Sequence, residues 1–282
     1  MPFPGLDARG RFAAFFGPMT DQSTDIARGA AWIAGRRLAR RDIADMPATL
    51  KPVDEAGGYA MQAALRDLLA PRLGPCIGWK VGATTAAMQS LLNVPSPCAG
   101  EMHRAGLHRG SAALRSGDFR RLGIECEIAM ELGAPLGGDG PVDEAGAAAA
   151  VARIFPAAEI VDDRYGDFRG FGVPALVADF FFHAGIVLGE PVADWRRLDL
   201  AAVAGTTRAN GETRVAGRGS DVLGHPMRSL AWLANRVAAL GRRLEPGQIV
   251  MTGSLPLPLW VAPGDRVEVR LEGLGSVSIA VD

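Results

Sequence analysis

The sequence predicts an α+β protein, in which a helical N-terminal region precedes a domain that contains the strands. Apolar residues recur at helical spacing between residues 25 and 69. Residues 124–132 instead alternate apolar and polar side chains, as a strand with two different faces does. Residues 248–281 hold three short β-type runs separated by glycine turns. We therefore expect an N-terminal arm and helical region over residues 1–73 and a β-containing domain over residues 74–282.

The composition is that of a soluble globular protein. The 282 residues are 48% hydrophobic and 22% charged, which allows a sizeable core. With 30 basic and 31 acidic residues, the net charge of −1 favours neither a nucleic-acid surface nor an electrostatic membrane anchor. No apolar run is long enough to cross a bilayer, and we see no secretory signal. Three cysteines without a CxxC pair indicate a reducing compartment, so we expect a cytoplasmic protein.

The N-terminal part begins with an arm over residues 1–20, rich in glycine and proline. A helix is expected over 25–41 and a second one from Asp54 or Glu55 to about Leu69, ended by Pro71 and by Gly74-Pro75. The next segment, 77–82, reads as a short strand in which Lys80 shares its face with two glycines. That arrangement leaves room for a ligand beside the amine, although a surface lysine is the alternative interpretation.

Beyond this strand, Thr84 or Thr85 is placed to cap a helix over 86–92, and the chain resumes an extended path at 98–102. In the strand over 124–132, Glu125 and Glu127 lie on one face because residues two apart point to the same side. Like charges side by side on a sheet repel each other. A hard cation such as Mg²⁺, Mn²⁺ or Ca²⁺ relieves that repulsion. A strand with one solvated face is the alternative.

The middle of the chain alternates helices and strands. Asp143 caps a predicted helix that runs to Arg153 or Ile154 and stops before Pro156. A strand over 157–165 follows, in which three acidic residues offer further carboxylates or simple turn contacts: Glu159, Asp162 and Asp163. We expect a buried helix over 174–184 and a short strand at 186–188.

The last third is mostly β. A strand pair over 198–204 and 206–215 is predicted to turn at Asn210-Gly211, and a helix over 226–240 begins with Pro226 and ends at Gly241. Three closing strands follow at 248–251, 266–271 and 277–281. After the first of them, Thr252, Ser254 and nearby N–H groups are suited to bind a carboxylate, or only shape an ST-turn.

Three common kinds of site find no support in the sequence. Ser220, Asp221 and His225 lack a GxSxG elbow, so a hydrolase triad is not expected. No GxGxxG sequence joins a strand to a helix, which argues against dinucleotide binding. A histidine-rich zinc site is not expected either, because the four histidines show no zinc-motif spacing: His103, His108, His183 and His225.

Six segments stand in a characteristic order: 78–84, 124–129, 156–161, 223–226, 247–255 and 273–277. Each is weak alone. As an ordered set they resemble the fumarylacetoacetate hydrolase superfamily, and more closely its 2-keto-4-pentenoate hydratase branch, which also contains the 4-oxalocrotonate decarboxylases. The resemblance covers roughly residues 25 to 281. It implies a mixed β-roll core that carries the site, with the N-terminal helices packed against it, and a homo-oligomer.

The resemblance also implies a set of site residues. Mg²⁺ or Mn²⁺ is expected on the two glutamates of the strand and on a third carboxylate: Glu125, Glu127 and Glu159. Lys80 matches a lysine that takes part in acid–base chemistry. The substrate carboxylate is expected at Thr252, Gly253 and Ser254, and Arg164 matches a family arginine that follows the third ligand. One departure stands out, since Cys98 occupies a loop position that is usually acidic; Glu101 is a candidate to replace it.

The function implied by the resemblance is hydration of a 2-oxo acid such as 2-keto-4-pentenoate. The keto and carboxylate oxygens of such an acid chelate one divalent ion, which stabilises the enolate formed when a proton leaves carbon 3. We expect Lys80 to move or position protons while water adds to a conjugated alkene. The same enolate serves C–C hydrolysis of an acylpyruvate and decarboxylation of a 2-oxo diacid, so both remain alternatives. A non-catalytic partner subunit is an alternative of another class.

Overall fold

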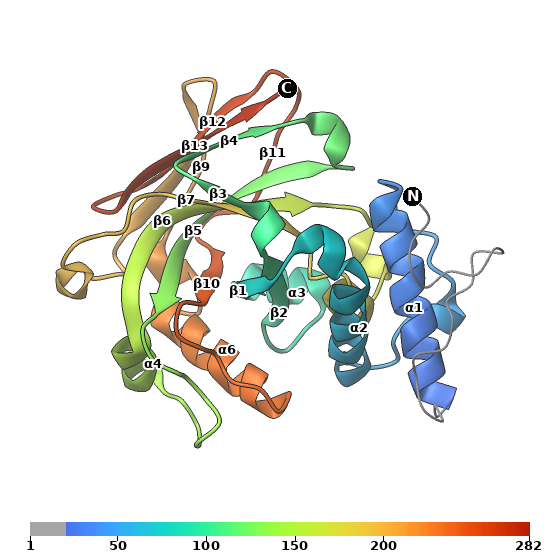
Figure 1. Cartoon of the computed structure of the whole chain (residues 1–282). Coiled ribbons are helices and arrows are strands. Elements are labelled where there is room, and N and C mark those ends of the chain that lie inside the picture. Colours follow the sequence, from blue (N-terminus) through green and yellow to red (C-terminus); the bar gives the residue numbers. More distant parts are fainter. Residues whose placement is uncertain (1–20) are drawn as a thin grey trace.

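The computed structural model describes residues 21–282, and the arm predicted for residues 1–20 lies outside this range. Helices gather on one side of a large curved sheet (Figure 1). The helices are α1 (Asp21–Leu38), α2 (Glu55–Leu73), α3 (Ala86–Leu92), α4 (Glu144–Ala150), α5 (Val173–Ala178) and α6 (Pro226–Ala239). The α+β class predicted from the sequence is confirmed. None of the described helices is long and apolar enough to cross a membrane.

The described strands form one 13-stranded mixed sheet. They are β1 (Cys76–Gly82), β2 (Cys98–His103), β3 (Leu107–Arg109), β4 (Ser111–Leu114), β5 (Leu122–Leu132), β6 (Val151–Asp162), β7 (His183–Leu188), β8 (Ala204–Ala209), β9 (Glu212–Arg218), β10 (Ile249–Ser254), β11 (Leu259–Trp260), β12 (Arg266–Leu271) and β13 (Gly275–Val281). Their order is β2-β1-β10-β5-β6-β7-β3-β4-β13-β12-β8-β9, and β11 pairs with β5. Three pairs are parallel, β1 with β10, β3 with β7 and β4 with β13.

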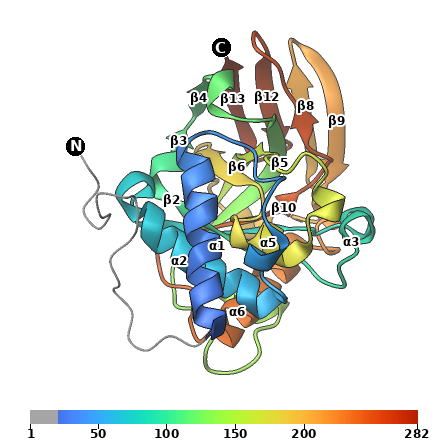
Figure 2. The ribbon, with the colours of Figure 1, turned by 90° about the vertical axis from the view of Figure 1, so that its right-hand side faces the viewer.

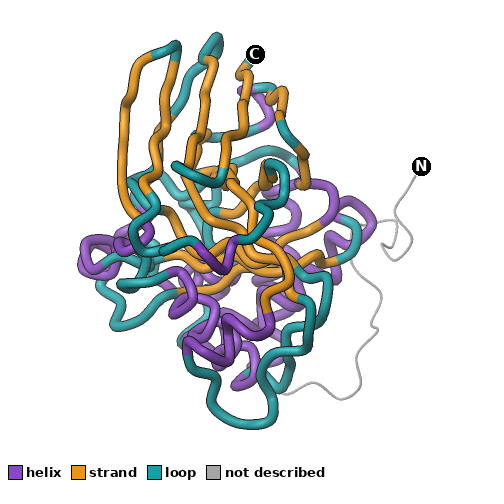
Figure 3. The backbone as a smooth tube through the Cα atoms, turned by 90° about the vertical axis from the view of Figure 1, so that its left-hand side faces the viewer, coloured by secondary structure: helices purple, strands orange, loops and turns teal. Residues whose placement is uncertain are grey.

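The sheet has two visible parts. The strands β12, β13, β8 and β9 stand together at one end of the molecule, away from the helices (Figures 2 and 3). The long strands β5 and β6 curve from there towards the helical end, where α6 and α4 lie beside them (Figure 1). The central strands β1, β10, β5, β6 and β7 are therefore enclosed, which is why their residues are almost all buried.

The helix α1 packs on α2, and α2 packs on α5 and bonds to β2 through a buried polar side chain. The amide of Gln62 on α2 donates to the carbonyl oxygens of Ala99 and Val177 and accepts from the N–H of Glu101. The predicted end of α2 at Gly74-Pro75 is confirmed, whereas Pro71 lies inside the last turn and does not end the helix. The helix continues to Leu73, because the N–H of Gly74 closes the last turn on the carbonyl of Ala70, and proline loses only one bond near the end.

Two predicted helices are shorter than expected. The helix predicted to reach Arg153 or Ile154 ends at Ala150, and the next residues join β6, because their pairing with β5 outweighs the helical pattern. The helix predicted over 174–184 ends at Ala178. Phe180, Phe181 and Phe182 then adopt left-handed backbone angles (φ 58°, 49° and 68°). Such angles cost roughly 1–2 kcal/mol per residue, so surrounding contacts must hold this turn.

The hairpin turn at Asn210-Gly211 is confirmed, and both residues have positive φ. The strand predicted over 198–204 is wrong. The carboxylate of Asp199 accepts from the N–H groups of Ala201 and Ala202, which folds this segment into a turn before β8 begins.

Candidate metal centre

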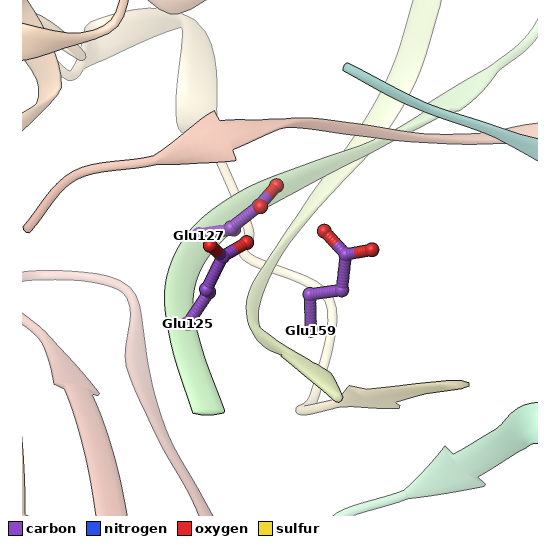
Figure 4. A group of neighbouring side chains, drawn as sticks. All are labelled: Glu125, Glu127 and Glu159. Carbon is purple, nitrogen blue, oxygen red and sulfur yellow. The ribbon is translucent and has the colours of Figure 1, made fainter. Parts of the chain in front are cut away.

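Three glutamates meet where β5 and β6 pair. Glu125 and Glu127 lie on one face of β5, and Glu159 on β6 stands directly opposite Glu125 in the ladder. Figure 4 shows the three side chains as neighbours, and one ligand oxygen from each lies within 4.8 Å of the others. Ile124, Cys126 and Ile128 point to the other face and are buried. The alternation in the sequence therefore placed the first two glutamates correctly.

The two fully buried carboxylates each have one oxygen held by the protein. Glu127 accepts the N–H of Gly253 at Oε2 (2.8 Å), and Glu159 Oε1 lies 2.9 Å from His183 Nδ1 and 3.3 Å from Lys80 Nζ. Among the described side chains, the remaining oxygens, Glu127 Oε1 and Glu159 Oε2, are buried without a hydrogen-bond partner. Buried carboxylate oxygens left unpaired are costly. An all-oxygen donor set of this kind fits a hard divalent cation.

The electrostatics of the three carboxylates lead to the same conclusion. Burial raises the pKa of Glu125 to about 8, and repulsion from Glu159 adds to the effect. Burial and then repulsion from its two neighbours raise the pKa of Glu127 well above its ordinary value. Burial also raises the pKa of Glu159, although Lys80 opposes that shift. The group is therefore short of positive charge, and a divalent cation would allow all three carboxylates to ionise.

Lys80 projects from β1 into this group and is 2% exposed. Burial lowers the pKa of its amine, but the three glutamates outweigh that effect, and the net pKa is raised. The expected free space beside it is not there. A Cβ on Gly82 would lie 2.4 Å from the ring of Phe181, and Lys80 Nζ is 5.1 Å from the centre of that ring. The glycine makes room for an aromatic neighbour of the amine rather than for a ligand.

The loop after β10 touches the site through its backbone. Gly253 has φ +115°, a conformation that suits glycine, and its N–H reaches Glu127. The hydroxyl of Thr252 donates to the carbonyl of Ile128 (2.8 Å) and that of Ser254 to the carbonyl of Pro256 (2.7 Å). Both hydroxyl protons thus serve loop geometry. The substrate-binding role of this segment stays a prediction.

Arg164 lies in a separate buried cluster. Its guanidinium pairs with Asp179 (2.8 Å) and Asp162 (3.1 Å), and Tyr165 and Arg37 also bond to Asp179. The structure therefore does not pair Arg164 with the three glutamates, and its predicted contact with substrate stays a prediction. The cluster instead anchors α1 to the turn that follows α5.

The structure places both Cys98, which occupies the usually acidic loop position, and Glu101, the candidate to replace that acidic group. Cys98 stands opposite Gly82 in the β1–β2 ladder, so its thiol is on the face of Lys80. Burial raises the pKa of this thiol to about 12, which keeps it neutral. Glu101 does not replace an acidic group there, because its carboxylate is paired with Arg66 (3.0 Å) and Arg242 on the other face.

His183 is the residue of this site that sequence reasoning missed. It is 6% exposed, and burial followed by the charges of Lys80, Arg37 and Arg164 lowers its pKa well below the ordinary value. Its only signal in the sequence is a polar residue that follows three phenylalanines, with no motif spacing around it.

Comparison with known proteins shows the family to which the chain belongs. Residues 93–282 match the fumarylacetoacetate hydrolase C-terminal family. The chain belongs to this family. It is 36% identical to a 2-hydroxyhexa-2,4-dienoate hydratase of Comamonas testosteroni, over 72% of this chain and 77% of the relative. It is also 32% identical to a 2-keto-4-pentenoate hydratase of Paraburkholderia phymatum, over 88% and 94% of the two chains.

The solved structures include a similar protein with bound ligands. This is the 4-oxalocrotonate decarboxylase of Pseudomonas putida G7 complexed with magnesium and adipate. Its TM-score against this chain is 0.86 at 29% identity, over 95% of this chain and all of the other. The resemblance and the fold type expected from the sequence are thus confirmed, and relatives of this fold bind divalent metal.

Proposed function

We propose that the chain is a divalent-metal-dependent hydratase of a 2-oxo acid in its 2-hydroxy-2,4-dienoate form, such as 2-keto-4-pentenoate. The observation that carries this proposal is the convergence of Glu125, Glu127 and Glu159 around unpaired buried oxygens, with the amine of Lys80 bonded to one of them. Hydratase relatives at 32% and 36% identity support it.

Mg²⁺ or Mn²⁺ would be held by these three glutamates. When bound, such an ion supplies a Lewis acid for the neighbouring keto and carboxylate oxygens of a 2-oxo acid. Lys80 holds a proton beside Glu159. For hydration of the dienol it would give that proton to carbon 5 and recover one from the 2-hydroxyl group, while water adds its hydroxyl at carbon 4 and its proton at carbon 3. The site around it is almost closed to water, since Glu127 and Glu159 are fully buried and Glu125 alone is partly exposed. Substrate therefore enters on the side of Glu125.

The predicted substrate contacts belong to the same proposal. The segment Thr252-Gly253-Ser254 would receive the carboxylate by turning one of its donors towards it, because its hydroxyl protons are donated to carbonyl oxygens and the N–H of Gly253 is donated to Glu127. Arg164 would contribute through its field, since its guanidinium is bonded to Asp162 and Asp179.

The test is an ultraviolet absorbance assay with Mg²⁺ or Mn²⁺ and 2-hydroxypenta-2,4-dienoate as substrate. We expect metal-dependent loss of the dienoate signal that Glu125→Ala abolishes. Glu131→Ala is the matched control, because Glu131 lies on the same strand but pairs with Arg153 (2.6 Å). Lys80→Ala should lose activity while it still binds metal, and full activity of that variant would refute the assigned role.

The same assay should include 4-oxalocrotonate and an acylpyruvate. The decarboxylase structure at TM-score 0.86 makes loss of CO₂ from the diacid the second candidate function. Cleavage of the acylpyruvate would assign the protein to the C–C hydrolases instead. A non-catalytic partner subunit predicts no metal at one ion per chain, which metal analysis of the purified protein decides. We also propose a homo-oligomer, and light scattering after gel filtration measures its mass.

A further inference from the structure

A turn between α5 and β7 brings a histidine to the metal centre. After Ala178 the chain leaves the helix, and Asp179 is held by Arg37, Arg164 and Tyr165. The guanidinium of Arg37 also donates to the backbone carbonyls of Asp179 (3.0 Å) and His183 (3.4 Å). Both ends of the left-handed Phe180–Phe182 turn are therefore fixed by one arginine of α1.

The strand pairing then directs the histidine towards Glu159. In the β6–β7 ladder Ile160 stands opposite Gly185, but Val161 stands opposite His183, so Ala184 is passed over. Such a bulge turns a residue to the other face of its strand. Residues opposite each other share a face, so His183 comes to the side of Val161 and hence of Glu159. Its Nδ1 lies 2.9 Å from Glu159 Oε1.

We propose that His183 is a positioning residue for the third metal ligand, which donates Nδ1–H to Glu159 Oε1 and so aims Oε2 of the same carboxylate at the cation. This inference rests on the proposed metal centre. The carboxylate accepts but cannot donate when ionised, so the proton of the shared bond belongs to the imidazole. Glu159 Oε2 is buried and without a partner among the described residues, as this role requires.

The second donor to the same oxygen explains why a histidine is needed. Lys80 Nζ also bonds to Glu159 Oε1, at 3.3 Å. A lysine that exchanges a proton with substrate cannot keep that bond unchanged through turnover. His183 has no such duty and holds the carboxylate while Lys80 acts. Loss of a hydrogen bond of this kind to a metal ligand typically weakens metal affinity by about 10–100-fold.

The first experiment measures the affinity of the metal-free protein for Mn²⁺ by electron paramagnetic resonance, without substrate. His183→Leu removes the donor and should weaken Mn²⁺ binding about 10–100-fold. His183→Asn keeps an N–H near the position of Nδ1 and should bind within about threefold of the wild type. His103→Leu is the control, because His103 is also buried (5% exposed) but its carboxylate contact is with Glu101 (3.8 Å), which is not one of the three glutamates of the centre.

Equal Mn²⁺ affinity for His183→Leu and the wild type would overturn the role of His183 and leave the metal centre intact. A wild type that binds no Mn²⁺ would overturn the centre and this role with it. A wild type that binds Mn²⁺ but hydrates no dienoate refutes only the proposed reaction.

A second measurement reads the position of the proton directly in the wild-type protein. Imidazole ¹⁵N spectra of the wild type, with the His183 signals assigned by comparison with His183→Asn, report which ring nitrogen carries the proton. The proposal requires Nδ1–H, and an Nε2–H form would refute it.

Discussion

The close contact of Gly253 with Thr84 predicts a large effect for the smallest possible substitution. A Cβ built on Gly253 would lie 2.4 Å from Thr84 Oγ1 and 2.5 Å from its Cγ2, and the backbone φ is +115°. A strained backbone of this kind costs about 1–3 kcal/mol for a residue with a Cβ. Overpacking adds about 1–3 kcal/mol. Gly253→Ala should therefore lower the free energy of unfolding by about 2–6 kcal/mol.

The same substitution should weaken the metal centre, because the displaced N–H of Gly253 is the donor to Glu127 Oε2. Urea titration measures the stability, and Mn²⁺ titration measures the affinity. Thr84→Ala removes the two nearest atoms but leaves Thr84 Cβ at 2.9 Å, so the double variant should recover much of the packing part of the loss and retain the backbone part. Wild-type values for Gly253→Ala in both titrations would refute the predicted strain and its effect on Glu127. Absence of any recovery in the double variant would refute the steric part alone.

Three further predictions follow from charge and burial. The pKa of Glu125 is raised from 4.5 to about 8, so the metal-free protein loses stability as pH rises from about 4.5 to 8, where the folded state keeps a proton that the unfolded state has lost. Mg²⁺ competes with that proton, and added Mg²⁺ should therefore raise Tm more at pH 8 than at pH 5.5. The thiol of Cys98, with a pKa of about 12, should resist iodoacetamide at pH 8 in the native protein and react in urea, as mass spectrometry would show. Arg37→Met breaks a pair with the fully buried Asp179 and should lower the free energy of unfolding by more than about 1 kcal/mol, but by less than the roughly 3–5 kcal/mol of a fully unpaired buried charge. Arg36→Met removes a more exposed pair, with Asp45, and should lower the free energy of unfolding by less than about 1 kcal/mol in the same urea assay.

Local pattern was enough to predict part of the site. Glu125 and Glu127 follow from the period of a strand, which needs no knowledge of what pairs with it. Glu159 is a ligand candidate because its strand pairs in the register that faces it to Glu125, and only the family resemblance could supply that register. His183 depends on a bulge between two strands distant in sequence, and no local pattern encodes it.

Among the helix ends, too, some follow from local sequence and others depend on contacts with distant residues. Asp143 and Thr85 cap α4 and α3 as predicted, since a cap acts on N–H groups two or three residues away. The early end of α5 depends on Arg37, which lies more than a hundred residues before Asp179 and withdraws that carboxylate from the helix. Contacts of this range override a helical pattern, and the sequence alone does not display them.

The register of β5 and β6 fixes the positions of the three glutamates independently of the loops around them. The carboxylates come from inside two paired strands, so the ladder of backbone hydrogen bonds fixes their spacing and no loop is needed to define it. A slip of one residue in the pairing would turn Glu125 and Glu127 to the apolar, packed side. Burial of two carboxylates there is unfavourable, so folding selects the register that forms the site. Loops at the strand ends are free to change length and chemistry while the three carboxylates stay in place. Related chains on this scaffold can thus acquire new substrates by altering the surroundings of an unchanged centre.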